Sequence, residues 1–285
     1  MRFKIVVQVK DEKKYKALQH YIFFNTSIII VLRKPNFSNM INSQELNNKI
    51  NQSGSLSVGD IMNTSFKLFK KVWTYGFLIQ LLLLAITIPV SLLLYNPLIQ
   101  ELVSQFSSGN FDPERIDALS IPSSFSGLLS FYGISLLLGA VKYLFYCGFY
   151  KIVRDIDEDR EANFKDVFLY FKPNYFGKGM LLMIIASLIS FFAAAMCLFP
   201  LIYAFVPVSF FIVFFAFNPD LAISEHINLS FNLGTKKWGV SFVASLLMFI
   251  ILLVGTLVSC GLGSLFLGAL VLLPFYVVYK QVILK

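Results

Sequence analysis

The longest uninterrupted apolar run sets the fold class of this chain. No charged residue occurs over residues 179–217. At 1.5 Å per helical residue, this run is roughly twice as long as one crossing of a bilayer about 30 Å thick requires. It must therefore turn back, and Pro200, near its middle, lacks the backbone N–H that a continuing helix needs. We expect a hairpin of two membrane-spanning helices; one long span followed by a re-entrant segment stays open as the alternative.

Four further apolar runs have spanning length, at residues 72–95, 128–150, 238–258 and 264–282. Only 14% of the residues are charged and 57% are hydrophobic, whereas a soluble domain carries about 25% charged residues. So much apolar surface is typical of a chain whose solvent is hydrocarbon. We therefore predict an all-α fold, a polytopic membrane domain with six transmembrane helices that makes up residues 57–285.

The basic residues predict how these helices are oriented. Twelve Lys and Arg precede the first span, six lie in residues 151–178, two lie between the fourth and fifth spans, and two lie at the C-terminus. The intervening connections carry almost no positive charge, with Arg115 alone in residues 96–125. Because cytoplasmic loops carry the excess of Lys and Arg, both termini are predicted in the cytoplasm. The net charge of +8 then predicts anionic lipid headgroups, and not nucleic acid, as the partner.

Three amphipathic segments precede the first, third and fifth spans on the predicted cytoplasmic side. They cover residues 57–71, 163–171 and 221–235, each with apolar side chains at helical spacing. We expect each to form a helix that lies on the membrane surface. The third leads into Lys236-Lys237-Trp238, a basic and aromatic anchor of the kind found at bilayer interfaces.

A similar anchor occurs 165 residues earlier in the chain. Setting Asn63 on Asn228 aligns six identical residues within eleven positions and superposes Trp73 on Trp238, the two tryptophans of the chain. Internal duplication explains this match, because many membrane folds contain repeats. Convergence of two interfacial anchors on the same biased composition is the alternative, and it stays open.

The N-terminal residues 1–56 differ from the rest of the chain. Their one apolar patch, residues 21–32, is too short to cross a bilayer, and a basic stretch follows it instead of a signal-peptide cleavage site. We expect residues 1–56 to be poorly structured, with 41–55 a flexible tail. Because nothing in residues 1–39 matches the membrane pattern, we also expect translation to start at Met40.

Seven side chains are candidate contacts for lipid or a protein partner. They come from the two anchors, from the amphipathic segments and from the one charge that lies away from the ends of the predicted spans: Trp73, Lys142, Phe168, Phe231, Lys236, Lys237 and Trp238. A charge in hydrocarbon costs at least about 2.5 kcal/mol on insertion scales. Lys142 lies about two turns from the end of its span, so its ammonium can reach back to the headgroups. Direct contact with a lipid headgroup or a substrate is the other interpretation.

No motif for catalysis, a cofactor or a metal occurs in the sequence. The acidic residues 155–161 lack the glycine and the final glutamate of a calcium-binding EF-hand loop, and Arg160 stands at the glycine position. His226 has one acidic neighbour in the sequence, Glu225. One histidine and one acid are too few for a metal site, so we predict that His226 is a surface side chain. A disulfide between Cys197 and Cys260 is conceivable. We expect no cofactor and no enzymatic activity.

Several short motifs within residues 57–283 resemble those of a known family. They are Phe164-Lys165-Asp166-Val167-Phe168, the Pro200 hairpin, Asn218-Pro219-Asp220, Ser230-Phe231 and Lys236-Lys237-Trp238. The pattern is similar to that of a bacterial six-span family, the YciC-like proteins and the membrane domain attached to some glycerophosphoryl diester phosphodiesterases. The resemblance implies a multi-pass protein of the bacterial inner membrane. It does not imply phosphodiesterase activity, which belongs to a separate soluble barrel domain.

Two functions follow from these observations. The first is a non-enzymatic structural, regulatory or lipid- or partner-binding module, which explains the amphipathic segments; the sequence names no protein partner. The second is a transporter or permease for a small or lipid-like solute, which proline-broken helices and a possible repeat favour. Apart from Lys280, in the last turn of the sixth span, the predicted spans hold one lysine and no acid, which leaves few groups for proton-coupled transport.

Overall fold

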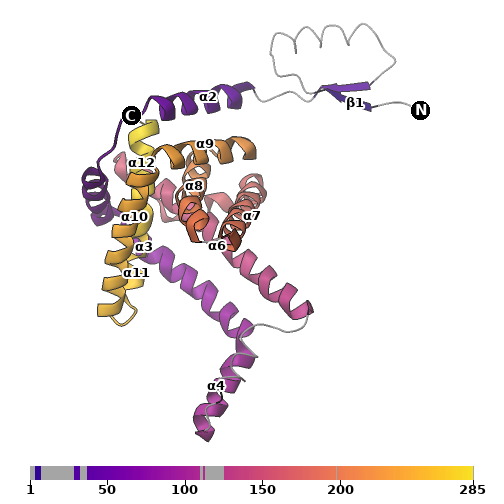
Figure 1. Cartoon of the computed structure of the whole chain (residues 1–285), viewed down its shortest axis with the longest axis vertical. Helices are drawn as coiled ribbons and strands as arrows, with labels where there is room; N and C mark the ends of the chain where they lie inside the picture. Colours follow the sequence, from indigo (N-terminus) through magenta and orange to yellow (C-terminus); the bar gives the residue numbers. More distant parts are fainter. Residues whose placement is uncertain are drawn as a thin grey trace.

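The structure, a computed structural model, describes residues 4–7, 29–32, 37–109, 112, 125–196 and 198–284 (Figure 1). Within this part of the chain, six helices are long and apolar enough to cross a membrane, as the sequence predicts. They are Val58–Leu94, Gly127–Asp157, Pro173–Met196, Phe199–Phe217, Trp238–Val258 and Gly263–Leu284. The membrane domain is therefore all-α and polytopic.

Five of the six spans in the described residues are each one continuous helix. Three of these are α3 (Val58–Leu94), α6 (Phe125–Asp157) and α10 (Trp238–Val258). α3 has 37 residues, so it is about 55 Å long and extends well beyond a bilayer. The sequence predicts a separate surface helix over residues 57–71, and this prediction is wrong because α3 runs through it without a break. The buried residues of α3 explain the continuity, since they recur every three or four positions along one face. They are Ile61, Ser65, Leu68, Val72, Gly76, Ile79 and Leu83.

The predicted hairpin is formed by α7 (Pro173–Met196) and α8 (Leu198–Phe217). The two helices have 24 and 20 residues, so one long span with a re-entrant segment is not what the chain forms. Pro200 lies in the first turn of α8, where a backbone N–H has no helical acceptor and proline therefore costs little. Pro207 lies inside α8.

The last span changes helix type along its length. It consists of α11 (Gly263–Leu267), the 3₁₀ segment η2 (Gly268–Leu272), α12 (Leu273–Tyr279) and the π-helical segment η3 (Lys280–Leu284). Pro274 lies in the first turn of α12, directly after the 3₁₀ segment. The irregularity therefore takes the form of a change in helix type.

The other two amphipathic segments are helical where the sequence predicts them. η1 (Phe164–Phe171) is a 3₁₀ helix, and the side chain of Asn163 caps its start by accepting a hydrogen bond from the backbone N–H of Lys165 at 2.9 Å. α9 (Ile223–Lys236) is an α-helix of 14 residues. Unlike the expected surface helix, α9 is packed against α8 along most of its length.

Four contacts show that α9 lies antiparallel to α8. The ring of His226 lies 5.7 Å from that of Phe215, and the ring of Phe231 lies 6.1 Å from that of Phe211. Further along, Gly234 lies against the backbone of Pro207, and the hydroxyl of Thr235 lies 2.7 Å from that of Tyr203. Residue numbers rise along α9 as they fall along α8, so the end of α9 lies beside the first half of α8.

The structure differs from the sequence prediction at two polar segments. Residues 41–55 are predicted as a flexible tail, but they lie mostly in α2 (Phe37–Gln52), whose Leu46 and Ile50 side chains are buried. The outer loop predicted over residues 96–125 begins with α4 (Asn96–Ser108). Near the N-terminus, two strands, β1 (Lys4–Val7) and β2 (Ile29–Leu32), pair in parallel.

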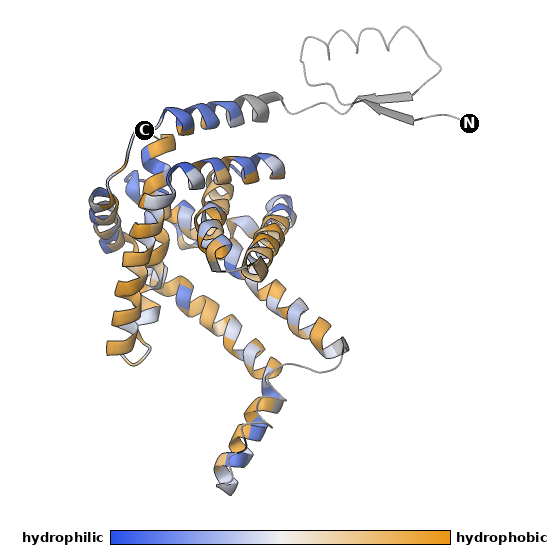
Figure 2. Ribbon diagram, viewed as in Figure 1, coloured by the Kyte–Doolittle hydropathy of each residue, from blue (hydrophilic) through white to orange (hydrophobic). Residues whose placement is uncertain are grey.

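The elements form two levels (Figure 1). α2 and α9 lie across one end of the helix bundle, near the C-terminus, whereas α4 and the far halves of α3 and α6 extend away from the other side. The hydrophilic residues concentrate on α2 and α9, and the hydrophobic residues on the spans (Figure 2). We call the end that holds α2, α9, η1 and η3 the basic end.

Candidate membrane-surface site

Acidic side chains at the end of α6 fasten it to neighbouring elements of the basic end. The Asp157 carboxylate accepts hydrogen bonds from the Tyr276 hydroxyl at 2.7 Å and from the Lys280 ammonium at 2.6 Å. These contacts join α6 to α12 and η3. The guanidinium of Arg154 lies 5.4 Å from the ring centroid of Phe217, at the end of α8, which is a cation–π distance.

Two further acids of this run, Asp155 and Glu158, are also paired with cations. Asp155 contacts Lys151 and lies 2.9 Å from Arg160, and Glu158 lies 2.8 Å from both Arg154 and Arg160. The cations occupy the carboxylate oxygens that a calcium ion would need. Within the described residues, no group of three or more His, Cys, Asp or Glu could hold a metal ion.

Lys237 is a structural residue of the basic end. Its side chain is 6% exposed, and its ammonium donates to the carbonyl of Ser53 at 3.2 Å and to that of Gly54. Burial lowers the pKa of Lys237, and the neighbouring Lys236 lowers it further. Lys237 thus holds the chain that connects α2 to α3, and it is not free to meet a lipid headgroup as the sequence suggests.

α2 covers the outward face of α9 through polar contacts. The side-chain amide of Asn232 donates to that of Asn47, and the Lys236 ammonium donates to the backbone carbonyl of Asn51. The Ser43 hydroxyl donates to the Glu225 carboxylate at 2.9 Å. The sequence did not predict this interface, because α2 has no strong apolar stripe that would indicate packing against another helix.

Trp238 lies where the sequence predicts an interfacial anchor. Its indole N–H donates to the carbonyl of Tyr203 at 3.1 Å, and its ring is stacked on that of Phe242 with centroids 4.8 Å apart. Phe231, from the amphipathic segment before this anchor, is packed against Phe211 of α8 instead of facing lipid. The structure therefore brings Trp238 into a cluster with Tyr203, which the sequence did not single out.

The other anchor lies on α3 and is open to the surroundings. Trp73 is 42% exposed, and Lys67, Lys70 and Lys71 are exposed in the turn and a half before it. Lys71 forms one ion pair, with Asp159 at 3.5 Å, and both side chains are exposed. Exposed pairs of this kind contribute about 0–1 kcal/mol, so the three lysines keep most of their capacity to attract anions.

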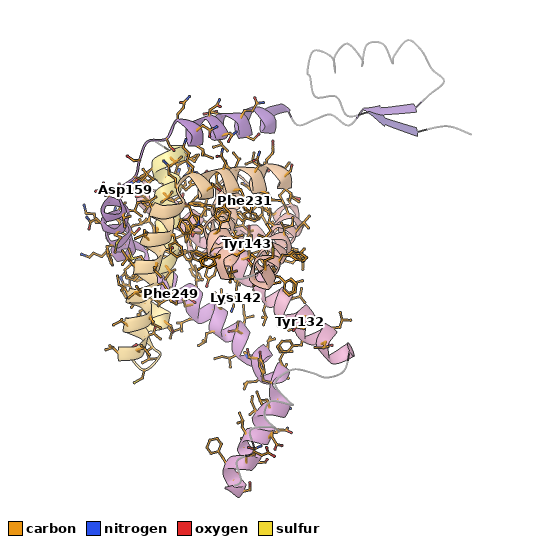
Figure 3. All side chains as sticks on the ribbon, in the orientation of Figure 1. Tyr132, Lys142, Tyr143, Asp159, Phe231 and Phe249 are labelled. Atoms are coloured by element: carbon orange, nitrogen blue, oxygen red, sulfur yellow. The ribbon has the colours of Figure 1, made fainter. Side chains whose placement is uncertain are left out.

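Two predicted contacts lie apart from these clusters. Lys142 is exposed on α6, and Figure 3 places it away from Phe231 on α9. Phe168 is exposed on η1, and its ring lies 5.5 Å from that of Phe145. The candidate residues therefore form no single pocket; they are spread over α3, α6, η1 and the junction of α9 with α10.

His226 is not the surface side chain that the sequence predicts. It is fully buried, and neither ring nitrogen has a hydrogen-bond partner within the described residues. Burial lowers the pKa of His226 from 6.5 to about 3, and the nearby Lys178 ammonium also lowers it. The helical spacing of His226, Leu229 and Leu233 was the signal for this buried face.

Two of the three cysteines lie within the described residues. Cys147 is buried and Cys260 is exposed, each with a free thiol. Cys197 lies outside the described residues, so its predicted pairing with Cys260 stays a prediction.

The fold and the basic end together define the class of the protein, an integral multi-pass membrane protein. No protein-family model, curated protein or solved structure matches the chain.

Proposed function

We propose that this protein is a non-enzymatic module of a bacterial inner membrane whose basic end binds the anionic lipids of the cytoplasmic leaflet. Both termini then lie in the cytoplasm, in keeping with the excess of Lys and Arg at this end. The resemblance to the YciC-like family supports the same location. The observation that carries the proposal is the exposed face of α3.

This face changes from cationic to apolar along one continuous helix. Lys67 and Lys70 are exposed on it, Trp73 is exposed one turn later, and Leu78 and Leu81 are exposed beyond that. From Lys70 to Leu81 the helix rises about 16 Å. A phospholipid has the same order of groups, with an anionic headgroup above an interfacial region and acyl chains, so the helix face matches one leaflet.

The attraction has a predictable size. A lysine near an anionic membrane surface contributes about 1 kcal/mol, and this contribution decreases as salt screens it. Three exposed lysines within five residues therefore favour anionic over zwitterionic lipid at the protein surface. Lys236 adds to the same field, because it is exposed at the end of α9.

The test measures which lipids surround the protein. The purified chain is reconstituted in bilayers that contain equal amounts of phosphatidylglycerol and phosphatidylcholine, each traced in turn with a spin label. We expect wild type to favour phosphatidylglycerol, and the triple variant Lys67→Gln, Lys70→Gln, Lys71→Gln to lose most of this preference. The matched Lys→Arg triple variant keeps the charges and should behave as wild type. A Gln triple variant with unchanged preference would contradict the proposal.

A second candidate function has one specific observation in its favour. The last span is discontinuous, with the 3₁₀ segment η2 at its centre and the buried residues Ala269 and Leu270 in it. Broken helices near the middle of a membrane are a feature of transporters. Solute flux through proteoliposomes that depends on the protein, and that Gly268→Leu abolishes, would favour this function over the lipid-binding module.

A further inference from the structure

An apolar groove of about 350 Å³ lies between α8, α10 and η2, apart from the α3 face. Ile202 and Phe205 of α8 and Phe242, Leu246 and Phe249 of α10 form most of its lining. Ile202 is 40% exposed and Phe249 is 49% exposed, so the groove opens on the surface of the bundle. Figure 3 shows Phe249 on the α10 side.

One end of the groove leads into polar groups. Phe242, in the groove wall, is stacked under Trp238, whose indole N–H is bonded to the carbonyl of Tyr203. The Tyr203 hydroxyl lies 2.7 Å from the Thr235 hydroxyl, and both side chains are exposed. Lys236 follows directly and is exposed too. The antiparallel packing of α9 on α8 is what brings Thr235 and Lys236 to this place.

The polar groups at this end determine which lipid the groove can prefer. Lipid tails are as apolar as the groove lining, so apolar contact alone gives no preference for one lipid over another. The bond between Tyr203 and Thr235 uses one of their two hydroxyl protons, and the other proton is free to be donated to an ester or phosphate oxygen. Residues 235–238 carry two cations and no acid, which complements a negatively charged phosphodiester.

We propose that the groove, together with Tyr203, Thr235 and Lys236, binds one anionic glycerophospholipid. One acyl chain lies in the groove between α8 and α10. The headgroup accepts a hydrogen bond from the hydroxyl pair and faces the ammonium of Lys236, which donates one of its three protons to the carbonyl of Asn51 and has two others. The inference deepens the proposed function, because it adds one specific lipid site to a surface that otherwise attracts anionic lipids in general.

The experiment counts lipids retained by the protein. Native mass spectrometry of the full chain, released from micelles with equal phosphatidylglycerol and phosphatidylcholine, should show one phosphatidylglycerol held more strongly than any other lipid. The double variant Thr235→Val, Lys236→Gln should weaken retention about fivefold or more, the factor that corresponds to about 1 kcal/mol for one lysine. Ile202→Trp, at the exposed rim, should fill the groove and also displace the lipid.

Two controls separate this site from the general surface effect. Leu253→Trp adds the same ring at a position of α10 that is 46% exposed and outside the groove lining, and it should retain the lipid. The triple Gln variant of α3 should also retain it while losing the preference of the surrounding lipids. Equal retention of both lipids by wild type, or unchanged retention by both site variants, would overturn the inference and leave the proposed function standing.

Discussion

α3 and the α9–α10 pair have matching sequences but follow different paths. Six residues are identical at the same spacing, including Trp73 and Trp238. α3 is one helix from Val58 to Leu94, whereas the chain between α9 and α10 leaves the helical conformation at Lys237, with φ −109° and ψ 23°. A shared local sequence therefore does not fix whether the anchor bends.

The partners of each helix explain the difference. The same face is buried in both, since Ile61 and Ser65 of α3 occupy the positions of His226 and Ser230 of α9 and all four are fully buried. In α3 this face continues without interruption into the span. In α9 it is packed on α8, while α10 is packed on α3 and the last span, so the chain must change direction between them. Neither result decides between duplication and convergence.

The largest expected effect comes from the site that fixes α9 to α8. In Gly234→Ala, the new methyl carbon would lie 2.5 Å from the Cα and 2.8 Å from the nitrogen of Pro207, and backbone atoms cannot easily move away. We expect a loss of about 2–3 kcal/mol in stability, measured as a lower melting temperature in detergent. Gly239→Ala, with no atom within 4 Å, is the control and should not destabilise. Equal melting of the two variants would show that the close contact is unimportant.

The next effect distinguishes the bent anchor from the straight one. Lys237→Met should cost about 2 kcal/mol, because it removes the buried charged donor that holds the carbonyls of Ser53 and Gly54. Lys71→Met on α3 removes only an exposed pair with Asp159 and should cost less than about 0.5 kcal/mol. Both are measured by thermal denaturation. Similar costs would mean that the two anchors are energetically equivalent.

A smaller, pH-dependent effect concerns His226. Its pKa is lowered from 6.5 to about 3 in the fold, so between these values the unfolded chain binds a proton that the folded chain does not. Stability should therefore be complete above pH 6.5 and decrease as the pH falls, by about 1 kcal/mol at pH 5.5. His226→Ile, which copies Ile61 of α3, should remove this contribution in melting curves recorded from pH 7 to 5. Asn228→His, exposed on the same helix, is a control that should leave the slope unchanged.

The smallest effect concerns α2, which has no counterpart along α3. Asn232→Lys places on α9 the residue that α3 has at the corresponding position, Lys67, and removes the contact with Asn47. We expect a loss of about 0.5 kcal/mol, because the bond is neutral and only partly buried. Hydrogen exchange should become faster in residues 43–52. Unchanged exchange there would show that the contact between Asn232 and Asn47 does not help to hold α2.

Apolar length and charge distribution were enough to predict the spans and the class of protein. Residues 179–217 are uncharged over about twice the length of one span, so they had to form a hairpin. The sequence could not show that α9 would lie on α8, because that contact depends on Gly234 meeting Pro207 across two helices. The docking of α2 was also hidden, since amide pairs such as Asn47 with Asn232 leave no periodic pattern. The buried His226 was readable from its helical spacing, but its polarity suggested a surface.

The central claim is that six helices cross the membrane with the basic end on the cytoplasmic side. The direct measurement is labelling of single cysteines by a membrane-impermeant maleimide, in a background without the three native cysteines. Lys165→Cys and Asn228→Cys, at the basic end, should react only after the cytoplasmic side is opened, whereas Leu262→Cys, at the turn between α10 and α11, should react in intact cells. Labelling of all three positions from the same side would contradict the account.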